Sequence, residues 1–416
     1  MPSQFSRKFS RPSAITTLME DLNQGVRDPN SLMLGGGNPA QIPEVKSRLQ
    51  NYLESAVADG ALLEAVSNYD GPLGSDSFRD ALAGLLSDYF GTGVTPQHIA
   101  LTNGSQSAFF ALANLFAGRR ADGSLKKILL PMSPEYIGYS DLGVNDDLFI
   151  SHPAKITLLP DREFKYQIDF DRFVLDDSIG MVLTSCPTNP TGNMLTDSEL
   201  AELDSRCQQA GVPLLLDCAY GAPFPNILFE DTRLPFNDNI ILCLSLSKLG
   251  LPGVRCGIVV AAPELISRMA NLAGVISLAP GSLGPVITEP MVRSGEILRL
   301  STEVIRPYYK EKSAIMMKAL KQAIPDPRFR IHKSEGAIFL WLWFDGLSIS
   351  SQQLYEKLKN RGLIVVAGHH FFPGISEQSD HINACIRVSY AQPNEVLQQA
   401  IKILSEEVNP LYEEQP

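Results

Sequence analysis

The chain has 416 residues, a formal net charge of −11, 44% hydrophobic residues and 19% charged residues, a composition typical of a folded globular protein. The acidic balance leaves no broad basic surface to neutralise phosphate backbones, so nucleic acid is excluded as the main partner. The length exceeds that at which a single hydrophobic core usually stops growing, and it predicts two domains.

No apolar run reaches roughly 18 residues, the length that a membrane-spanning helix needs. The first residues, with Arg7, Lys8 and Arg11, lack the apolar stretch of a secretory signal, so a cytoplasmic location is expected. The six cysteines show no CxxC spacing and are interpreted as reduced core residues. The adjacent His369 and His370 do not share one side of an element, and no metal site is predicted.

Between residues 97 and 260, short apolar runs alternate with segments of helical length. Because these runs are apolar on both faces, they predict strands buried in a mostly parallel α/β sheet. The runs are residues 98–101, 127–130, 181–184, 212–216, 240–244 and 256–260. They predict a large domain over residues 46–305, preceded over residues 1–45 by an N-terminal arm and the start of a small domain.

The pattern changes after about residue 305. A long amphipathic helix runs through Leu320, and an apolar strand from Ala337 to Phe344, a helix around residues 354–359 and two more strand-like runs follow. This order of elements predicts a smaller α+β domain over residues 306–416. No repeat or low-complexity linker separates the two domains, so they are expected to pack closely.

The first segment that suggests chemistry runs from Leu101 to Ser107, at the end of a predicted strand. Gly104 and Ser105 stand where a helix begins, and the free backbone N–H groups and the dipole of a helix start can bind an anion. An ordinary helix cap would carry the same residues. This segment alone leaves both interpretations open.

A second segment, Pro187 to Gly192, is a loop that follows the strand ending near Ser185. Two prolines and a glycine fix this loop, so the Asn189 amide can point into the space beyond the strand ends. Open α/β sheets bind their ligands in that space. A plain turn is the alternative.

A third segment ends a buried strand with Asp217 and places Tyr220 three residues later. An ionised aspartate at this point can pair with a protonated pyridine nitrogen, which makes the ring an electron sink. The alternative is a helix N-cap, a position that suits aspartate well.

The most informative segment surrounds Lys248, directly after a buried strand. The lysine amine can form an imine with an aldehyde, and the hydroxyls of Ser245 and Ser247 and the guanidinium of Arg255 can donate to a phosphate. Taken alone, the segment also fits an exposed loop lysine. Asn189, Asp217 and Lys248 each follow a successive strand-like run, so one crevice can hold all three.

Together, SLSKLGLPGVR around Lys248, DCAY from Asp217, NPTG from Asn189 and GSQ from Gly104 resemble the fold-type I aminotransferases of the aspartate aminotransferase superfamily. The resemblance covers nearly the whole chain. It implies the pyridoxal phosphate (PLP) fold-type I architecture, an α/β large domain with a mostly parallel seven-stranded sheet and a smaller α+β domain. It also implies pyridoxal 5'-phosphate as cofactor and amino-group transfer between an α-amino acid and a 2-oxo acid.

The same resemblance implies roles for individual residues. Lys248 would hold the cofactor as a Schiff base and move the proton between Cα and the cofactor. Asp217 would pair with the pyridine nitrogen, and Asn189 and Tyr220 would bond the phenolic oxygen. The phosphate would be held by Gly104, Ser105, Gln106, Ser245, Ser247 and Arg255.

Four further positions carry over from the family. Tyr136 stands where an aromatic ring covers the cofactor, although a core tyrosine is the alternative. Tyr69 resembles the tyrosine that reaches the phosphate of the neighbouring subunit, which implies a homodimer. Arg387 resembles the arginine that grips the substrate α-carboxylate with a bidentate fork. Gly37, over the substrate, and Asn189 would complete the substrate site.

The segment from Ser277 to Pro285 carries no arginine of the kind that dicarboxylate-specific relatives use, which favours a small aliphatic substrate. Alternatives are an alanine or aromatic aminotransferase of broader specificity, or a β-lyase on the same fold. A non-enzymatic cofactor-binding regulator is disfavoured, because the short arm before Gly35 is expected to leave no room for a DNA-binding module.

Overall fold

The computed structural model describes residues 3–10, 12–13, 15–16, 18–20, 23 and 31–414. Other residues of the predicted arm over 1–45 lie outside the described residues. Among the described residues, the α-helices with complete bounds are α1 Gln4–Lys8, α3 Pro43–Ala58, α4 Ala61–Ser67, α5 Asp76–Phe90, α6 Ser105–Phe116, α7 Asp197–Ala210, α8 Pro263–Ile276, α9 Leu283–Arg293, α10 Glu296–Arg299, α11 Arg306–Ala323, α12 Ser351–Asn360 and α13 Asn394–Glu413.

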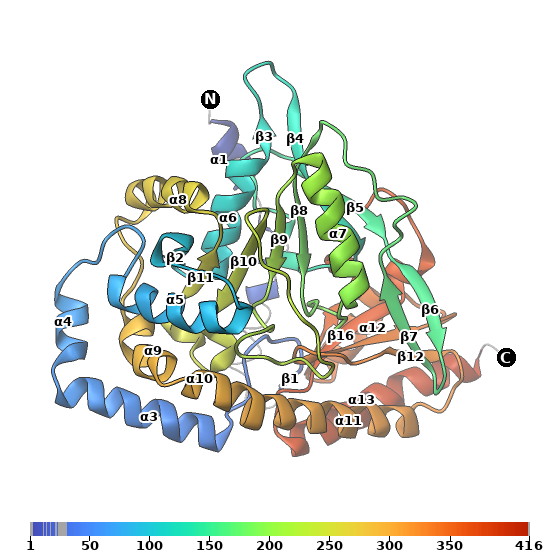
Figure 1. The fold of residues 1–416 in the computed structure, drawn as a ribbon. Coiled ribbons are helices and arrows are strands. Elements are labelled where there is room, and N and C mark those ends of the chain that lie inside the picture. Colours follow the sequence, from blue (N-terminus) through green and yellow to red (C-terminus); the bar gives the residue numbers. More distant parts are fainter. Residues whose placement is uncertain are drawn as a thin grey trace.

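A large sheet lies at the centre of the molecule (Figure 1). It has eight strands in the order β2-β11-β10-β9-β8-β4-β3, and β5 also pairs with β4. All neighbours from β10 to β5 are parallel, whereas β11 is antiparallel to both of its neighbours. The strands are β2 Ile99–Thr102, β3 Gly118–Arg119, β4 Leu125–Ser133, β5 Phe149–Pro153, β8 Ile179–Ser185, β9 Leu214–Asp217, β10 Ile240–Ser245 and β11 Gly257–Val260.

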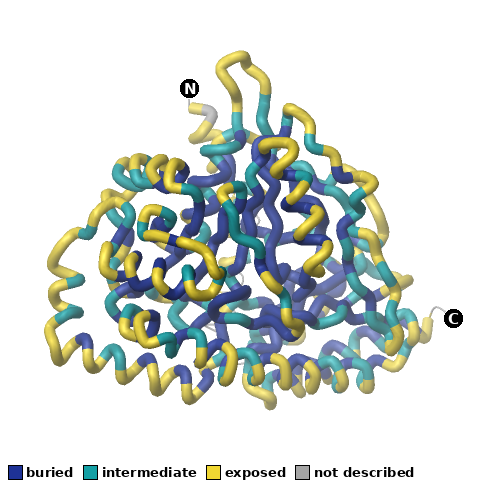
Figure 2. Tube along the Cα trace, in the orientation of Figure 1, coloured by how far each residue is buried: buried dark blue, intermediate teal, exposed yellow. Residues whose placement is uncertain are grey.

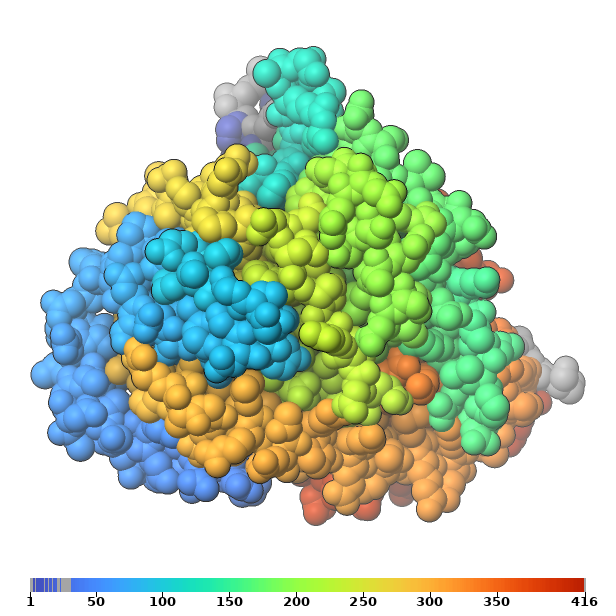
Figure 3. Space-filling view, in the orientation of Figure 1, coloured from blue at the N-terminus to red at the C-terminus, as the bar shows by residue number. Residues whose placement is uncertain are grey.

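The predicted α/β class with a mostly parallel sheet is confirmed, and each of the six predicted strands is present. The predicted number of seven strands is one too low. The strands beyond the six predicted runs are β5 and β3, and β3 is a two-residue strand that pairs antiparallel with the start of β4 across a short turn. This hairpin projects from the rest of the molecule (Figures 1 and 3).

Alternate residues of each central strand face opposite sides of the sheet, as the two-residue period of a strand requires. Leu214 and Leu216 of β9 belong to the core beneath α5 and α7. Leu215, between them, belongs to a second core with residues of α6 and α8. Helices therefore cover both faces, and the strands form the buried layer of Figure 2.

Helix α7 shows how the sequence sets its own boundaries. Thr196 and Glu199 form a capping box at its start, with Thr196 Oγ1 accepting from the Glu199 N–H at 3.2 Å. Gly211 ends the helix with a φ of +63°, a left-handed conformation that glycine adopts without steric cost. This helix carries the chain from the end of β8 back to the start of β9.

A second sheet of six strands forms the smaller α+β part, in the order β15-β16-β13-β12-β7-β6. Its strands are β6 Lys155–Leu159, β7 Glu163–Gln167, β12 Phe329–His332, β13 Phe339–Phe344, β15 Val366–Ala367 and β16 Cys385–Ser389. Two strands from the middle of the chain, β6 and β7, thus join strands from its last third. Near the start, β1 (Leu32–Met33) pairs in parallel with β14 (Leu363–Ile364).

The predicted long helix through Leu320 is confirmed as α11, which continues α10 through a π-helical segment, Leu300–Ile305. The predicted domain boundary at 305/306 falls inside this continuous helical run, and the domain boundaries stay predictions. Helices α3 and α11 are distant in the sequence, but both lie along the lower side of the molecule in the view of Figure 3. Within the described residues, no helix has both the length and the apolar character that a membrane crossing requires.

Candidate active site

The residues predicted to share one crevice come from three adjacent parallel strands. Asp217 is the last residue of β9, and Lys248 and Asn189 lie in the segments that follow β10 and β8. Since parallel strands point their carboxyl ends to the same edge of a sheet, the three side chains gather at one edge.

Lys248 is partly buried, and its Nζ donates a hydrogen bond of 2.6 Å to the carbonyl oxygen of Gly37. The ammonium also lies 5.1 Å from the centre of the Tyr220 ring. Burial and the nearby cations Arg387 and Arg255 lower the pKa of Lys248 from 10.5 to about 8, against the opposing effect of Asp217. The amine is therefore mostly charged at neutral pH, but a larger fraction of it is neutral than in an ordinary lysine.

Asp217 is buried, and both of its carboxylate oxygens accept hydrogen bonds. Oδ2 accepts from the Tyr139 hydroxyl at 2.7 Å, and Oδ1 accepts from the backbone N–H of Ala219 at 3.0 Å. Burial raises the pKa of Asp217 from 3.8 to about 6, while these two donors and Lys248 favour the ionised form. A carboxylate at this point can pair with a protonated ring nitrogen.

Arg387, on β16 of the second sheet, reaches the same edge. Its guanidinium donates to Oδ1 of Asn189 at 2.8 Å and to the carbonyl oxygen of Gly35 at 2.6 Å. The rings of Phe339 and Phe371 lie 4.1 and 4.9 Å from its central carbon, measured to the ring centres. These contacts fix the plane of the guanidinium, which a bidentate carboxylate site needs.

The third nitrogen of the Arg387 guanidinium differs from the two that donate to Asn189 and Gly35. Within the described residues, its Nε is buried without a hydrogen-bond partner. Burial lowers the pKa of Arg387 to about 10. A buried cation with an unused donor suits an anionic ligand, because an unpaired buried donor costs about 1–3 kcal/mol.

The predicted phosphate site lies where α6 begins. Gly104 precedes this helix with a φ of +86°, and a Cβ built there would lie 2.2 Å from Nη2 of Arg255. The exposed Arg255 guanidinium thus lies beside Gly104 at the start of α6, the end of a helix where backbone N–H groups lack helical partners. Ser105 and Gln106 turn their side chains to carbonyl oxygens, with Ser105 Oγ donating to Leu244 and Gln106 Nε2 to Gly138.

Ser245 and Ser247 are both buried beside Lys248. The Ser247 N–H donates to Ser245 Oγ at 3.1 Å, which closes the short turn that carries the lysine. Gly257 on β11 lets this edge pack tightly, because a Cβ there would lie 2.6 Å from the backbone N of Ser105.

Tyr136 and Tyr220 lie in the same group of side chains. The Tyr136 ring meets that of Tyr139 edge to face, with ring centres 5.3 Å apart. The Tyr220 ring packs against Phe339 at 5.8 Å. Burial is the main cause that raises the pKa of both Tyr136 and Tyr220, so both phenols stay protonated and can donate.

Within one chain, Tyr69 is a predicted site residue that lies away from the group around Lys248. It follows α4 and is 87% exposed. The loop after it, however, runs beside β2, where the Leu101 N–H donates to the Leu73 carbonyl oxygen at 3.0 Å.

Five residues at this edge were not predicted to take part: Tyr139, Gly35, Glu135, Phe339 and Phe371. Glu135 is fully buried, and its carboxylate accepts from the Thr184 hydroxyl, the Ser185 N–H and the Ser185 hydroxyl. Burial raises the pKa of Glu135 to about 8. The sequence offered one signal, since Glu135 and Tyr139 flank the predicted Tyr136.

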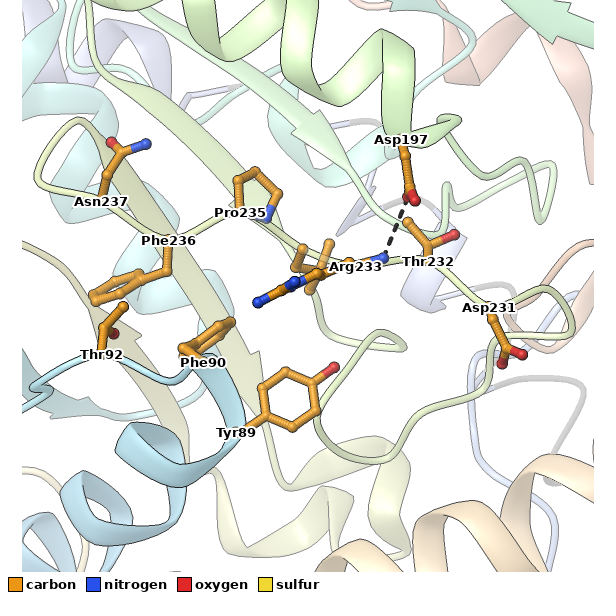
Figure 4. Close-up of a pocket in the computed structure, with 11 residues that line it drawn as sticks. Tyr89, Phe90, Thr92, Asp197, Asp231, Thr232, Arg233, Pro235, Phe236 and Asn237 are labelled. Atoms are coloured by element: carbon orange, nitrogen blue, oxygen red, sulfur yellow. Dashed lines mark hydrogen bonds between the residues drawn. The ribbon is translucent and has the colours of Figure 1, made fainter.

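A separate surface cavity of about 770 Å³ lies between the end of α5 and residues 231–237 (Figure 4). Tyr89, Phe90 and Arg233 line it, and the Arg233 N–H donates to Asp197. None of the predicted site residues lines this cavity. Among the described residues, no group of three or more His, Cys, Asp or Glu side chains is placed to hold a metal ion.

At the edge of this mostly parallel sheet, a lysine with a lowered pKa, a buried carboxylate and an oriented arginine lie together, an arrangement that suits a group-transfer enzyme with anionic ligands. The chain belongs to the class I and II aminotransferases, whose family model matches residues 149–404.

Individual relatives agree with this assignment over the whole chain. The valine–pyruvate aminotransferase of Escherichia coli K12 is 50% identical over 98% of this chain and 97% of its own length. The crystal structure of the valine–pyruvate aminotransferase AvtA of Salmonella typhimurium LT2 has a TM-score of 0.89 and 48% identity, over 96% of this chain and 100% of its own. A putative amino-acid aminotransferase of Psychrobacter arcticum 273-4 has a TM-score of 0.96 and 41% identity, with both chains fully covered.

Proposed function

We propose that this protein is a pyridoxal 5'-phosphate-dependent valine–pyruvate aminotransferase, which converts L-valine and pyruvate to 2-oxoisovalerate and L-alanine. The observation that carries the proposal is the position of the Lys248 amine among Asp217, Tyr220 and Arg387 at one sheet edge. The choice of valine and pyruvate is supported by the names of the two relatives that are 50% and 48% identical.

The residues present fit this cofactor. Three cations, Lys248, Arg255 and Arg387, outnumber the ionised carboxylate of Asp217, because the raised pKa of Glu135 keeps that carboxyl protonated, and this surplus of positive charge suits a phosphate and a substrate carboxylate. Because Gly104 has a positive φ and no side chain, a space remains between its backbone and Arg255, and any side chain would fill that space. Gly104, Ser105, Gln106, Ser245, Ser247 and Arg255 would hold the phosphate, Asp217 the ring nitrogen, Asn189 and Tyr220 the ring oxygen, and Lys248 the aldehyde carbon.

When bound, the cofactor supplies an electron sink that stabilises negative charge at the substrate Cα. Lys248 is the group that can move the proton. Because burial and two cations bring its pKa to about 8, a fraction of the amine is neutral at neutral pH and can accept a proton at Nζ. The Gly37 carbonyl oxygen, which accepts from Nζ, directs the amine toward the side of the site where Gly37 lies.

Arg387 would bind the substrate carboxylate. Its guanidinium is held between Phe339 and Phe371 and is anchored by Asn189 and Gly35, so it is oriented before the substrate arrives. The aromatic rings also exclude water from the cation, which strengthens its attraction for a carboxylate.

A substrate with a small aliphatic side chain suits the apolar groups around Arg387. Phe339 contacts both the position above Gly37 and the face of Arg387, and these apolar surfaces offer nothing to a second carboxylate. The segment from Ser277 to Pro285 also contains no arginine.

A homodimer that shares its sites is part of the proposal. Tyr69, at 87% exposure, would reach the phosphate of the partner's site. Large apolar side chains on nearby elements are also exposed, Leu63 at 70% and Val66 at 60% on α4 and Val275 at 86% on α8. A second copy of the chain would cover them. The cytoplasmic location stays a prediction from the sequence.

The experiment that tests the function is an absorbance titration of the purified protein, first with L-valine and then with pyruvate. A visible band of the lysine-bound cofactor that valine bleaches and pyruvate restores is the expected result. A response to another amino acid but not to valine would keep the aminotransferase and discard this substrate. Release of a keto acid without an acceptor would favour a β-lyase, and a protein without a band after added cofactor would contradict the proposal.

A further inference from the structure

A buried ion pair lies behind the Asn189 loop, on the side of the second sheet. Lys165 of β7 pairs with Glu335, which lies in the segment before β13, and their side chains are only 13% and 5% exposed. Neither residue touches the predicted catalytic groups. Both residues contact the segment that follows Asn189, residues 192–194.

The Lys165 ammonium uses all three of its donors at this point. Besides Glu335, it donates to Oδ1 of Asn193 at 3.2 Å and to the carbonyl oxygen of Met194 at 2.8 Å. The same Glu335 oxygen accepts from the Met194 N–H at 3.0 Å. The pair therefore binds both a side chain and the backbone at the end of the loop.

Backbone hydrogen bonds hold the loop rigidly between the Lys165–Glu335 pair and Asn189. The Thr188 N–H donates to the Asn193 carbonyl oxygen at 2.9 Å, and the Glu335 N–H donates to the Gly192 carbonyl oxygen at 3.2 Å. Gly192 has a φ of +70°, and a Cβ there would lie 2.6 Å from the Gly336 carbonyl oxygen. A shift of Asn193 is thus passed on to the neighbour of Asn189.

The position of Asn189 matters because its Oδ1 accepts from Arg387, while its amide N–H groups remain for another partner. We propose that Lys165 and Glu335 are positioning residues that hold Asn189 against Arg387 and so orient the carboxylate-binding guanidinium. The role of Arg387 in this inference rests on the proposed function. Buried ion pairs contribute little net stability compared with apolar residues of similar size, so orientation is the property that this pair supplies.

The test uses the double variant Lys165→Met/Glu335→Met, which removes both charges together and leaves no buried unpaired ion. Hydrogen–deuterium exchange of residues 188–194, measured on the protein without cofactor, should become about tenfold faster. In the holoenzyme the KM for the amino acid should rise about tenfold with kcat changed less than about threefold, because binding and not proton transfer is affected.

The matched control is Lys321→Met/Glu163→Met. This Lys–Glu pair, with N–O distance 2.6 Å and side chains 18% and 24% exposed, also joins β7 to a neighbouring element, but it does not contact the loop. It should leave both the exchange of residues 188–194 and the KM unchanged. Equal effects in the two double variants would overturn the proposal.

If the first double variant fails to fold, Glu335→Gln serves in its place, since it keeps the volume and an acceptor for the Met194 N–H. The increases in the exchange rate of residues 188–194 and in the KM should be smaller than in the double variant. Faster exchange with an unchanged KM, or an unchanged exchange, would reduce the pair to a structural role and overturn the inference. A wild-type protein that exchanges slowly at this loop yet performs no transamination would contradict the proposed function instead.

Discussion

The hydroxyl of Tyr139 donates a hydrogen bond of 2.7 Å to Oδ2 of Asp217. Burial raises the pKa of this carboxyl to about 6, and the Tyr139 bond is the strongest influence that opposes the increase. Burial also raises the pKa of Tyr139 itself well above its ordinary value, so the phenol stays a donor. Tyr139 therefore keeps Asp217 ionised, the form that pairs with a protonated ring nitrogen.

Replacing Tyr139 by phenylalanine retains the ring that packs against Tyr136 and Phe109 and removes only the donor. Without it the pKa of Asp217 rises further, and a smaller fraction is ionised at pH 7. A hydrogen bond to a charged group contributes about 1.5–3 kcal/mol, so kcat should fall by about tenfold or more. The acid limb of the kcat–pH profile should move to higher pH.

Tyr52→Phe is the control, because it also removes a bond from a tyrosine to a carboxylate, that of Glu296, outside the site. It should change neither kcat nor the pH profile. A Tyr139→Phe enzyme with a normal acid limb would show that Asp217 does not depend on this donor.

Tyr139 also marks the limit of the sequence-based prediction. The segment around Tyr136 was identified, yet a local pattern does not tell which of two tyrosines turns toward Asp217, which lies 78 positions away in the chain. That Lys248, Asp217 and Asn189 lie at one edge of the sheet could be predicted, because each stands at or after the end of a buried apolar strand.

The strands show the same division. β8, β9 and β10 are apolar on both faces and were predicted, whereas β6 is mostly exposed and alternates charged or polar with apolar residues. The parallel pairing of β7 with β12 joins Glu163 to Ile331 across a large sequence separation. Nothing in either segment alone specifies that partner, and so the ion pair of Lys165 with Glu335 could not be predicted.

Gly104→Ala is expected to weaken cofactor binding by about tenfold. Its φ of +86° and ψ of 157° lie in a region that only glycine adopts readily, and its new Cβ would meet the Arg255 guanidinium. The exposed arginine can move away at small cost, but it then leaves the place where it would meet the phosphate. Equilibrium titration of the cofactor-free protein with pyridoxal 5'-phosphate gives the dissociation constant.

Gly60→Ala is the control that distinguishes the effect of backbone strain from the effect of moving the Arg255 guanidinium. Gly60 has a φ of +82° with no other atom within 4 Å of a built Cβ. It should lose roughly 1–2 kcal/mol of stability from the left-handed conformation and keep its cofactor affinity. Equal losses of affinity in both variants would mean that strain alone, and not Arg255, explains the effect.

Glu135→Gln should become progressively more stabilising, relative to the wild type, as the pH rises. The folded pKa of Glu135 is about 8 against an ordinary 4.5, because burial disfavours the charged form. The stability that the protonated carboxyl contributes is fully present below about pH 4.5 and is lost as the pH rises through about 8. Glutamine does not titrate, and its oxygen can still accept from Thr184 and Ser185.

The measurement is the free energy of unfolding of both proteins, in urea, at intervals from pH 5 to pH 9. The difference between variant and wild type should grow up to about pH 8 and then level off. A difference that stays constant over this range would show that Glu135 does not take up a proton on folding.

The amine of Lys248 should control the rate at which the cofactor-free protein takes up pyridoxal 5'-phosphate. Because only the neutral amine attacks an aldehyde, the rate should rise by about tenfold per pH unit below the lysine pKa and level off near pH 8. Stopped-flow measurement of the visible band between pH 6 and pH 10 follows this rate. Arg387→Met removes a cation that lowers the pKa of Lys248 and should move the midpoint to higher pH, whereas Asp217→Asn should move it lower. A rate that still climbs tenfold per unit at pH 9.5 would mean that the site leaves Lys248 as basic as an ordinary lysine, whose pKa is about 10.5.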